Sequence, residues 1–242
     1  MKKKLIIIIG ILSVFIQCDT TEKSVEITHY KDSLKIEGSD HATIYIDKGK
    51  KFNHPSFVIW LEDTEGKYMK TIFITQSYAS GIFGHAALTD STWDNKPGES
   101  IQLAALPYWT FKKGLINNKV LVPTKEHPFL DAYSGETPKS NFRFDSNLKS
   151  EKDTFRILIE VNQPWDWNNF WTNNKYPESK SYKHSAQPSI IYAVTINKTI
   201  KEYYLNPIGH GDPKGESGEL FTNLTTLSSA KEIFKSVRIV IK

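Results

Sequence analysis

Cysteine is nearly absent from this sequence, because Cys18 is the only one among 242 residues. One cysteine forms neither an internal disulfide nor a thiolate cage around a metal ion. Long apolar runs are also scarce: only residues 5–16 form one, and these 12 residues fall short of the about 20 that cross a bilayer. The motifs Gly-x-Ser-x-Gly and His-Glu-x-x-His are missing, which argues against an α/β-hydrolase and a zincin-type metalloprotease.

An excess of charge of one sign is also missing once the N-terminus is set aside. The formal net charge is +4, but three lysines precede the apolar run and residues 1–17 contain no acid. Removing residues 1–17 would leave 28 basic and 27 acidic residues. A nearly neutral remainder gives no charge-based support for nucleic-acid binding, so we expect no nucleic-acid partner.

The N-terminal order of three lysines, a short apolar run and Cys18 predicts a secretory signal in residues 1–17. Residues 15–18 (FIQC) resemble a bacterial lipobox, in which the cysteine is acylated and becomes the new N-terminus. Gln17 stands where that motif has a small residue. The resemblance implies lipidation of Cys18, a tether over residues 18–24 and a membrane-anchored protein of the bacterial cell envelope, in the periplasm or at the cell surface. Plain secretion with a free thiol and an uncleaved anchor are the alternatives.

Residues 25–242 are predicted to form one mainly β domain, because short stretches alternate or are rich in β-branched residues. Two short helices are expected, over residues 107–114 and residues 229–234, the second opened by a capping box of Ser229 and Glu232. Many strands and few helices favour an antiparallel β-sandwich of immunoglobulin-like type. The predicted strands are residues 25–30, 34–37, 42–46, 56–61, 68–75, 155–161, 190–196, 202–205 and 237–241.

Two of these strands carry more specific predictions. Asp63 and Gly66 lie between residues 56–61 and 68–75, and both are turn formers, so they predict a hairpin. In residues 155–161 the odd-numbered side chains are apolar, whereas Arg156 and Glu160 fall on the opposite face. We therefore expect one face of this strand in the core and the other in water.

Residues 131–137 (DAYSGET) resemble the flavinylation motif of extracytoplasmic flavoproteins, which reads Asp, two variable residues, Ser or Thr, Gly, Ala and Thr. In that motif a flavin transferase joins the phosphate of FMN to the final threonine. The resemblance implies attachment at Thr137, a tight turn at Gly135, and recognition by Asp131 and Ser134. Glu136 departs from the motif's alanine and places a carboxylate beside an incoming phosphate. An ordinary exposed turn is the alternative.

A wider resemblance covers roughly residues 40–165. It consists of a strand reading FVIWLEDTEGKYMKT at residues 57–71, the segment LPYW at residues 106–109, the 131–137 segment and a strand at residues 157–161. This order is similar to the DUF2271 family of uncharacterised bacterial envelope proteins, some of them found with flavin transferases. The resemblance implies a redox context with a flavin transferase and a redox partner. Trp109 and Tyr133 would then be candidates to stack on the flavin.

Three tryptophans lie within residues 165–171 (WDWNNFW). Extended geometry would place Trp165, Trp167 and Trp171 on one side, where flat rings next to Asn and Asp suit a glycan or a protein ligand. This predicts an alternative function as a non-catalytic binding lipoprotein. The competing interpretation is that the tryptophans fill one end of the core.

Catalytic and metal-binding candidates are few. His210 and Asp212 lie in the glycine-rich residues 209–218, a predicted flexible turn, but two ligands are too few for a metal site. No nucleophile or acid–base pair identifies an enzyme. The sequence thus favours an envelope lipoprotein that carries FMN covalently at Thr137 as an accessory of redox chemistry, with the aromatic binding function as the alternative.

Overall fold

The computed structural model describes residues 26–31, 41–87, 92–116, 119–148, 152–197 and 199–242. The predicted signal in residues 1–17, Cys18, the tether over residues 18–24 and the predicted strand 34–37 lie outside these ranges. Within the described ranges, no helix combines the length and the apolar composition that a membrane crossing needs.

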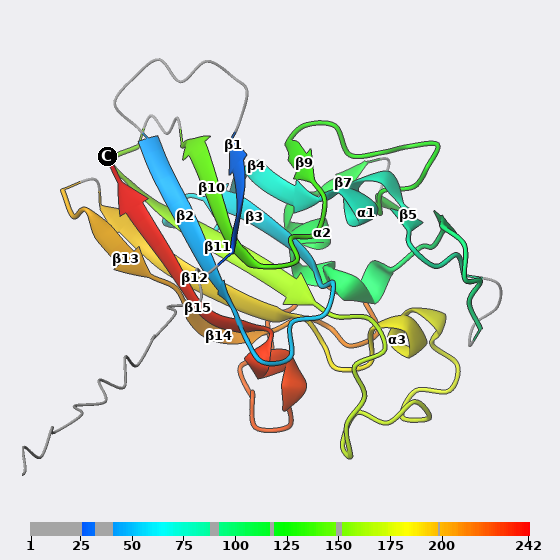
Figure 1. Ribbon diagram of the computed structural model, residues 1–242. Coiled ribbons are helices and arrows are strands. Elements are labelled where there is room, and N and C mark those ends of the chain that lie inside the picture. The colour runs from blue at the N-terminus through cyan, green and yellow to red at the C-terminus, as the bar shows by residue number, and fades with distance from the viewer. Residues whose placement is uncertain (1–25, 32–40, 88–91, 117–118, 149–151, 198) are drawn as a thin grey trace, which may run out of the picture.

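Two β-sheets pack face to face in a sandwich-like arrangement (Figure 1). Neighbouring strands are antiparallel except for β1 with β10 and β4 with β9, which are parallel pairs at sheet edges. The predicted sandwich is confirmed, and its immunoglobulin-like detail stays a prediction. The five-stranded sheet has the order β1 (Ile27–Lys31), β10 (Asn141–Asn147), β2 (His41–Lys48), β15 (Phe234–Ile241) and β13 (Glu202–Tyr204). The six-stranded sheet has the order β14 (Asn206–His210), β12 (Ile190–Asn197), β11 (Thr154–Asn162), β3 (Ser56–Glu62), β4 (Tyr68–Thr75) and β9 (Tyr133–Gly135).

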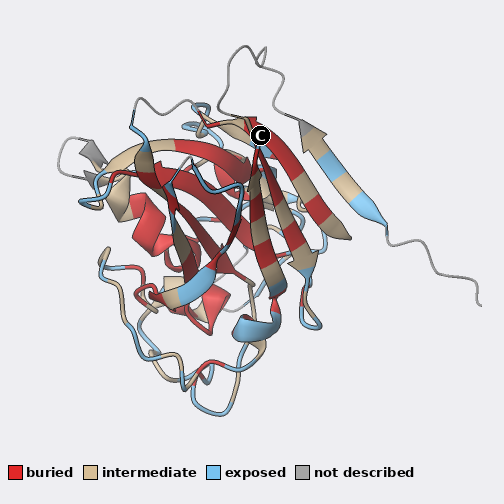
Figure 2. Ribbon diagram, turned by 90° about the vertical axis from the view of Figure 1, so that its left-hand side faces the viewer, coloured by how far each residue is buried: buried red, intermediate tan, exposed pale blue. Residues whose placement is uncertain are grey.

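The main core lies between the two sheets. It is rich in rings, with Phe57 stacked on Phe73 at a centroid distance of 5.1 Å and Phe142 edge-on to Phe73 at 5.0 Å. Figure 2 shows buried residues running along the strands of both sheets. Alternation along β2, β10 and β15 sends every second side chain into this core, as the period of a half-buried strand requires.

A second core covers the outer face of the six-stranded sheet. Trp60 and Leu158 of the sheet pack there with Tyr78 and Trp109 of the short helices. Every residue of β3 is consequently buried, because the strand has a core on each face. The short helices of this outer layer are α1 (Gln76–Ser80), η1 (Leu103–Ala105) and α2 (Pro107–Lys112). The other short elements are α3 (Lys180–Ser185), η2 (Ser229–Glu232), β5 (Ile82–Phe83) with β6 (Gly98–Glu99), and β7 (Leu115–Ile116) with β8 (Lys119–Val120).

Glu160 of β11 is fully buried, so the prediction of a wet face for this strand is wrong. The backbone N–H groups of Tyr108 and Trp109 donate to its two carboxylate oxygens at 3.1 and 2.7 Å, and Ser189 Oγ donates at 2.6 Å. These N–H groups open α2, where backbone donors have no partner within the helix. Burial raises the pKa of Glu160 to about 7, although the three hydrogen bonds act in the opposite direction.

Several local predictions meet different outcomes. The hairpin at Asp63 is confirmed, with Asp63 Oδ1 accepting from the backbone N–H of Lys67 at 2.9 Å and Gly66 at φ +82°. Helix α2 is confirmed, ending at Lys112. The segment at residues 229–232 is a 3₁₀ turn without the capping box, because the Ser229 hydroxyl donates to the Asp166 carboxylate instead.

Candidate functional site

The 131–137 segment contains an edge strand, so the expected tight turn at Gly135 is wrong. Tyr133–Gly135 form β9, which pairs with β4 through Phe73 opposite Tyr133 and Thr75 opposite Gly135. The open edge of β4 offers backbone hydrogen-bonding groups that an extended segment satisfies and a turn would not. Gly135 serves close packing, since a Cβ there would lie 3.2 Å from the rings of both Phe73 and Tyr133.

Thr137 follows β9 at the rim of the sandwich. Its hydroxyl donates to the carbonyl of Pro55 at 3.3 Å, and its side chain is half-buried. The preceding residue is held from the other sheet, because the Tyr30 hydroxyl of β1 donates to the carbonyl of Glu136 at 3.0 Å. The Tyr30 ring lies 5.9 Å from the ring of Tyr133. The threonine is thus fixed where the edges of both sheets meet.

Charges of both signs surround this rim. Asp131, Ser134 and Glu136 are exposed. Burial and, after it, the Glu136 carboxylate raise the pKa of Tyr30. Lys48 Nζ donates to the carbonyl of Lys139, two residues after Thr137, at 3.2 Å, which places one ammonium group near the segment.

Trp109 and Tyr133 are not brought together. Trp109 is fully buried in the outer core, where its indole N–H donates to Thr71 Oγ1 at 2.8 Å and its ring packs edge-on against Phe129 at 5.2 Å. Tyr133 instead packs against the main core, on the opposite face of the six-stranded sheet. Trp109 therefore offers no free ring face at the rim.

The tryptophans of residues 165–171 do not share one face, so the predicted extended geometry is wrong. The side-chain oxygen of Asn168 accepts from the backbone N–H groups of Phe170 and Trp171 at 2.9 and 2.7 Å, and this turn redirects the chain. Trp171 is consequently only 5% exposed, and its indole N–H donates to Thr226 Oγ1. The interpretation as core filler holds for Trp171 alone.

Trp165 and Trp167 instead join a third ring that the sequence analysis missed. Trp93 lies 4.7 Å from Trp165 between ring centroids, and Trp165 lies 5.5 Å from Trp167. Figure 1 shows the chain between β5 and β6, which carries Trp93, beside α3 and the loop that precedes it. We call Trp93, Trp165 and Trp167 the tryptophan platform. A lone tryptophan 72 residues away in the sequence gave no signal of this contact.

The backbone under the platform is strained and tightly held. Trp165 and Ala186 have φ angles of +61° and +63°, in the region that side chains other than glycine rarely adopt. The Trp165 N–H donates to the carbonyl of His184 at 2.9 Å, and Gln187 Nε2 donates to the carbonyl of Asp166 at 2.9 Å and to Ser229 Oγ at 2.6 Å. Such strain persists only where neighbouring contacts fix the conformation.

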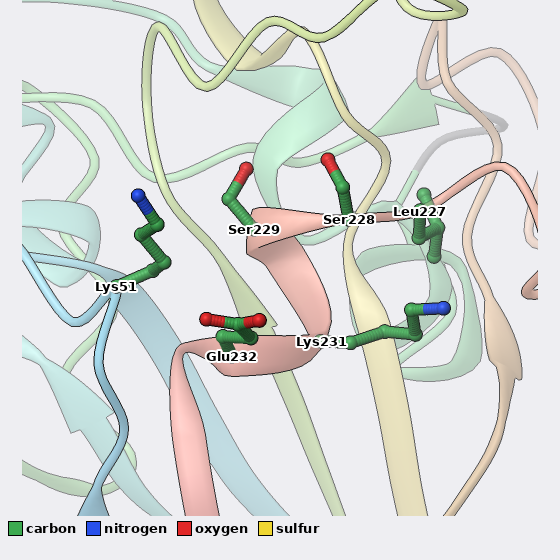
Figure 3. A pocket seen from close by; sticks show the side chains of 6 residues that line it. All are labelled: Lys51, Leu227, Ser228, Ser229, Lys231 and Glu232. Atoms are coloured by element: carbon green, nitrogen blue, oxygen red, sulfur yellow. The ribbon is translucent and has the colours of Figure 1, made fainter.

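An open polar cavity lies next to this network. Figure 3 shows the side chains of Lys51, Ser229 and Glu232 around one space, with Lys231 pointing to the other side of η2. The cavity measures about 660 Å³ and is lined by Lys51, Leu227, Ser228, Ser229, Lys231 and Glu232. Ser229 Oγ donates to Asp166 Oδ1 at 2.5 Å, so the carboxylate of Asp166 connects the cavity to the tryptophan platform.

The histidine-containing segment is packed rather than flexible. His210 ends β14, its ring stacks on Phe221 at 5.2 Å, and its Nδ1 lies 2.7 Å from the carbonyl of Gly211. The carboxylate of Asp212 accepts from Lys214 and Ser217. Across the described parts of the chain, no group of three or more His, Cys, Asp or Glu side chains is placed to hold a metal ion.

Comparisons of the chain with protein-family models, with curated proteins and with solved structures found no match.

Proposed function

We propose that the chain is a lipid-anchored protein of the bacterial cell envelope, of DUF2271 type, that carries FMN covalently on Thr137. FMN bound there would supply reversible electron transfer, and the chain would hold the flavin and tune it. The protein would serve as an accessory of envelope redox chemistry, loaded by a flavin transferase and paired with a redox partner.

One observation supports this proposal above the others: Thr137 is half-buried at the sandwich rim, and among the described residues its hydroxyl makes one long hydrogen bond of 3.3 Å. A hydroxyl held so weakly is available for esterification with little loss of folding energy. The exposed side chains of Asp131, just before the edge strand β9, and of Ser134, within it, precede Thr137 where a transferase can approach.

The charges and rings around Thr137 also fit a flavin phosphate. The ammonium group of Lys48 provides positive charge that offsets the unfavourable carboxylate of Glu136. Tyr133 and Tyr30 are half-buried rings beside the segment and would contact the isoalloxazine, whereas Trp109 lies on the other face of the sheet. We therefore assign ring contact to Tyr133 and exclude Trp109 from it.

The test is co-expression of the full chain with a flavin transferase in a bacterial host, followed by intact-mass measurement and in-gel flavin fluorescence. We expect a mass increase of one FMN less one water, which Thr137→Ala abolishes and Thr137→Ser retains. The surface variant Thr199→Ala is the matched control and should leave the adduct unchanged. The fluorescent species is expected in the membrane fraction, and Cys18→Ser should move it to the soluble fraction.

Two outcomes would contradict the assignment of covalent FMN to Thr137: no added mass in the wild-type chain, or an undiminished adduct in Thr137→Ala. Fluorescence that stays in the membrane fraction in Cys18→Ser would remove the lipid anchor while leaving the flavin assignment standing.

A further inference from the structure

The tryptophan platform presents more ring surface than a packed core leaves exposed. Trp93 is 47% exposed and Trp167 is 38% exposed, and Trp165 lies between them in contact with both. The rings of Trp93 and Trp165 are inclined at 46° and those of Trp165 and Trp167 at 70°, so the platform is angular rather than flat. Neither packing of the main core nor the flavin proposal uses these rings.

The platform is also fixed in place before any ligand arrives. Trp165 holds a left-handed backbone conformation that costs of the order of 1–3 kcal/mol for such a residue. Its ring packs on His184 at 5.3 Å, and the Asp166–Gln187–Ser229 hydrogen bonds fix the loop beneath it. A rigid aromatic surface loses little conformational entropy when a ligand binds. This rigidity supports a binding role for the exposed rings.

The ring area that the platform exposes is small compared with one side of a protein interface. Taking about 250 Å² for a whole tryptophan, the exposed parts of Trp93 and Trp167 amount to about 200 Å². A stable protein interface buries about 800 Å² on each side. The platform therefore fits a small or narrow ligand.

Polar groups next to the platform indicate the chemistry of that ligand. Lys51 and Glu232 face the same space and carry opposite charges, so the charged side chains there have no excess of one sign. Ser228 and Ser229 add hydroxyl groups to this lining, and a hydroxyl group both donates and accepts hydrogen bonds. A neutral molecule with many hydroxyl groups and apolar C–H faces matches both the cavity and the indole faces.

We propose that the tryptophan platform and the adjoining cavity bind a neutral oligosaccharide. The C–H faces of its sugar rings lie on Trp93 and Trp167, and its hydroxyl groups reach the serines of the cavity. This site is separate from Thr137 and does not depend on flavin attachment, so it gives an envelope protein a means of contacting polysaccharide.

The experiment is calorimetric titration of the full chain in detergent with cellohexaose, xylohexaose, maltohexaose and mannohexaose, at concentrations up to about 10 mM so that a millimolar Kd is measurable. We expect saturable binding of at least one of these sugars. Trp93→Ala and Trp167→Ala should each raise the Kd about tenfold or more. Phe170→Ala is the matched control, because Phe170 is 48% exposed but packs on Trp171, away from the platform.

Both platform variants remove exposed rings, so their far-UV circular dichroism should match that of the wild type. Absence of binding by all four sugars would overturn the proposal, as would a Kd that neither platform variant changes. Tighter binding of an oligogalacturonide than of every neutral sugar would overturn the neutral ligand class. Binding of phosphatidylglycerol vesicles by lipid-free Cys18→Ser protein, lost in Trp167→Ala, would reassign the platform to the membrane surface.

Discussion

Glu160 is a carboxylate that exchanges water for three protein donors. Its neighbours are the first backbone N–H groups of α2 and the hydroxyl of Ser189, and all three satisfy the carboxylate oxygens. A buried carboxylate in this position fixes the start of a six-residue helix that would not be stable alone. The residue therefore contributes to the outer layer rather than to a solvent face.

Substituting Glu160 tests its contribution to folding through the pH dependence of the free energy of unfolding. The pKa of about 7 in the folded protein exceeds the value of about 4.3 in an unfolded chain. The folded state therefore holds the proton more tightly, and stability falls as pH rises from about 4.3 to 7, by up to about 1.4 kcal/mol per pH unit. Glu160→Gln lacks this titration, so urea unfolding should show the wild type losing stability relative to the variant between pH 5 and pH 8.

The control for this measurement is Glu65→Gln, which removes one carboxylate from the exposed hairpin turn. Parallel curves for the wild type and Glu160→Gln would show that Glu160 is ionised in the fold throughout.

At the residue scale, the predictions from sequence patterns differ from the structure at specific residues. The alternation in residues 155–161 correctly assigns the side chains to two faces of the strand. Alternation does not show whether the second face contacts water or a second core, and here that face contacts the start of α2. Trp93 was missed because its partners are distant in the chain. Trp171 was misplaced because the turn at Asn168 depends on a side-chain hydrogen bond that an extended pattern ignores.

Among the elements, the glycine-rich residues 209–218 pack closely against the outer layer. Cβ atoms built at Gly215 and Gly218 would lie 2.7 Å from the backbone of Ala104 in η1 and 2.4 Å from Cβ of Phe111 in α2. The glycines are therefore needed for close approach, and the segment is a packed element rather than the flexible turn that its composition predicts.

Gly211→Ala tests the close packing of residues 209–218 directly. Its new Cβ would lie 2.6 Å from Ser189 Oγ and 2.8 Å from Cγ of Pro107, so atoms around Glu160 must shift. We expect a loss of about 1–3 kcal/mol in the free energy of unfolding, measured by urea titration. Gly84→Ala is the matched control, because nothing lies within 4 Å of a Cβ there. Equal midpoints for the two variants would contradict the close packing.

Strand prediction succeeded where β-branched residues alternate and failed where the strand depends on a neighbour. The bounds of β4 were predicted in full, and β2, β3, β11, β12 and β15 were found with small shifts at their ends. β9 and β14 contain Gly or Pro and exist because β4 and β12 offer open edges. The helices α1 and α3 were missed because five or six residues show no periodicity.

For the whole molecule, the most consequential pairing joins the two ends of the described chain. β15 lies between β2 and β13 in the five-stranded sheet, with Ile239 opposite Ile44, and both residues are fully buried. This strand is thus an interior strand of its sheet, and the main core is closed only when it is present.

Deleting residues 234–242 should therefore abolish cooperative unfolding, because β2 and β13 lose their shared partner and the main core is opened to water. Circular dichroism during urea titration measures this. Deleting Lys242 alone removes an exposed residue beyond β15 and should leave the transition near that of the wild type. A sigmoidal transition of native steepness in the longer deletion would contradict the central role of β15.

The pairing of β2 with β15 also sets when folding can finish. Their partners are separated by nearly 200 residues, so the contact forms late and carries a large loop-closure cost. Synthesis by the ribosome delivers β15 after the other described strands, and until then the five-stranded sheet lacks the strand between β2 and β13. A nascent chain without β15 therefore exposes apolar side chains of the main core, which makes it a substrate for chaperones.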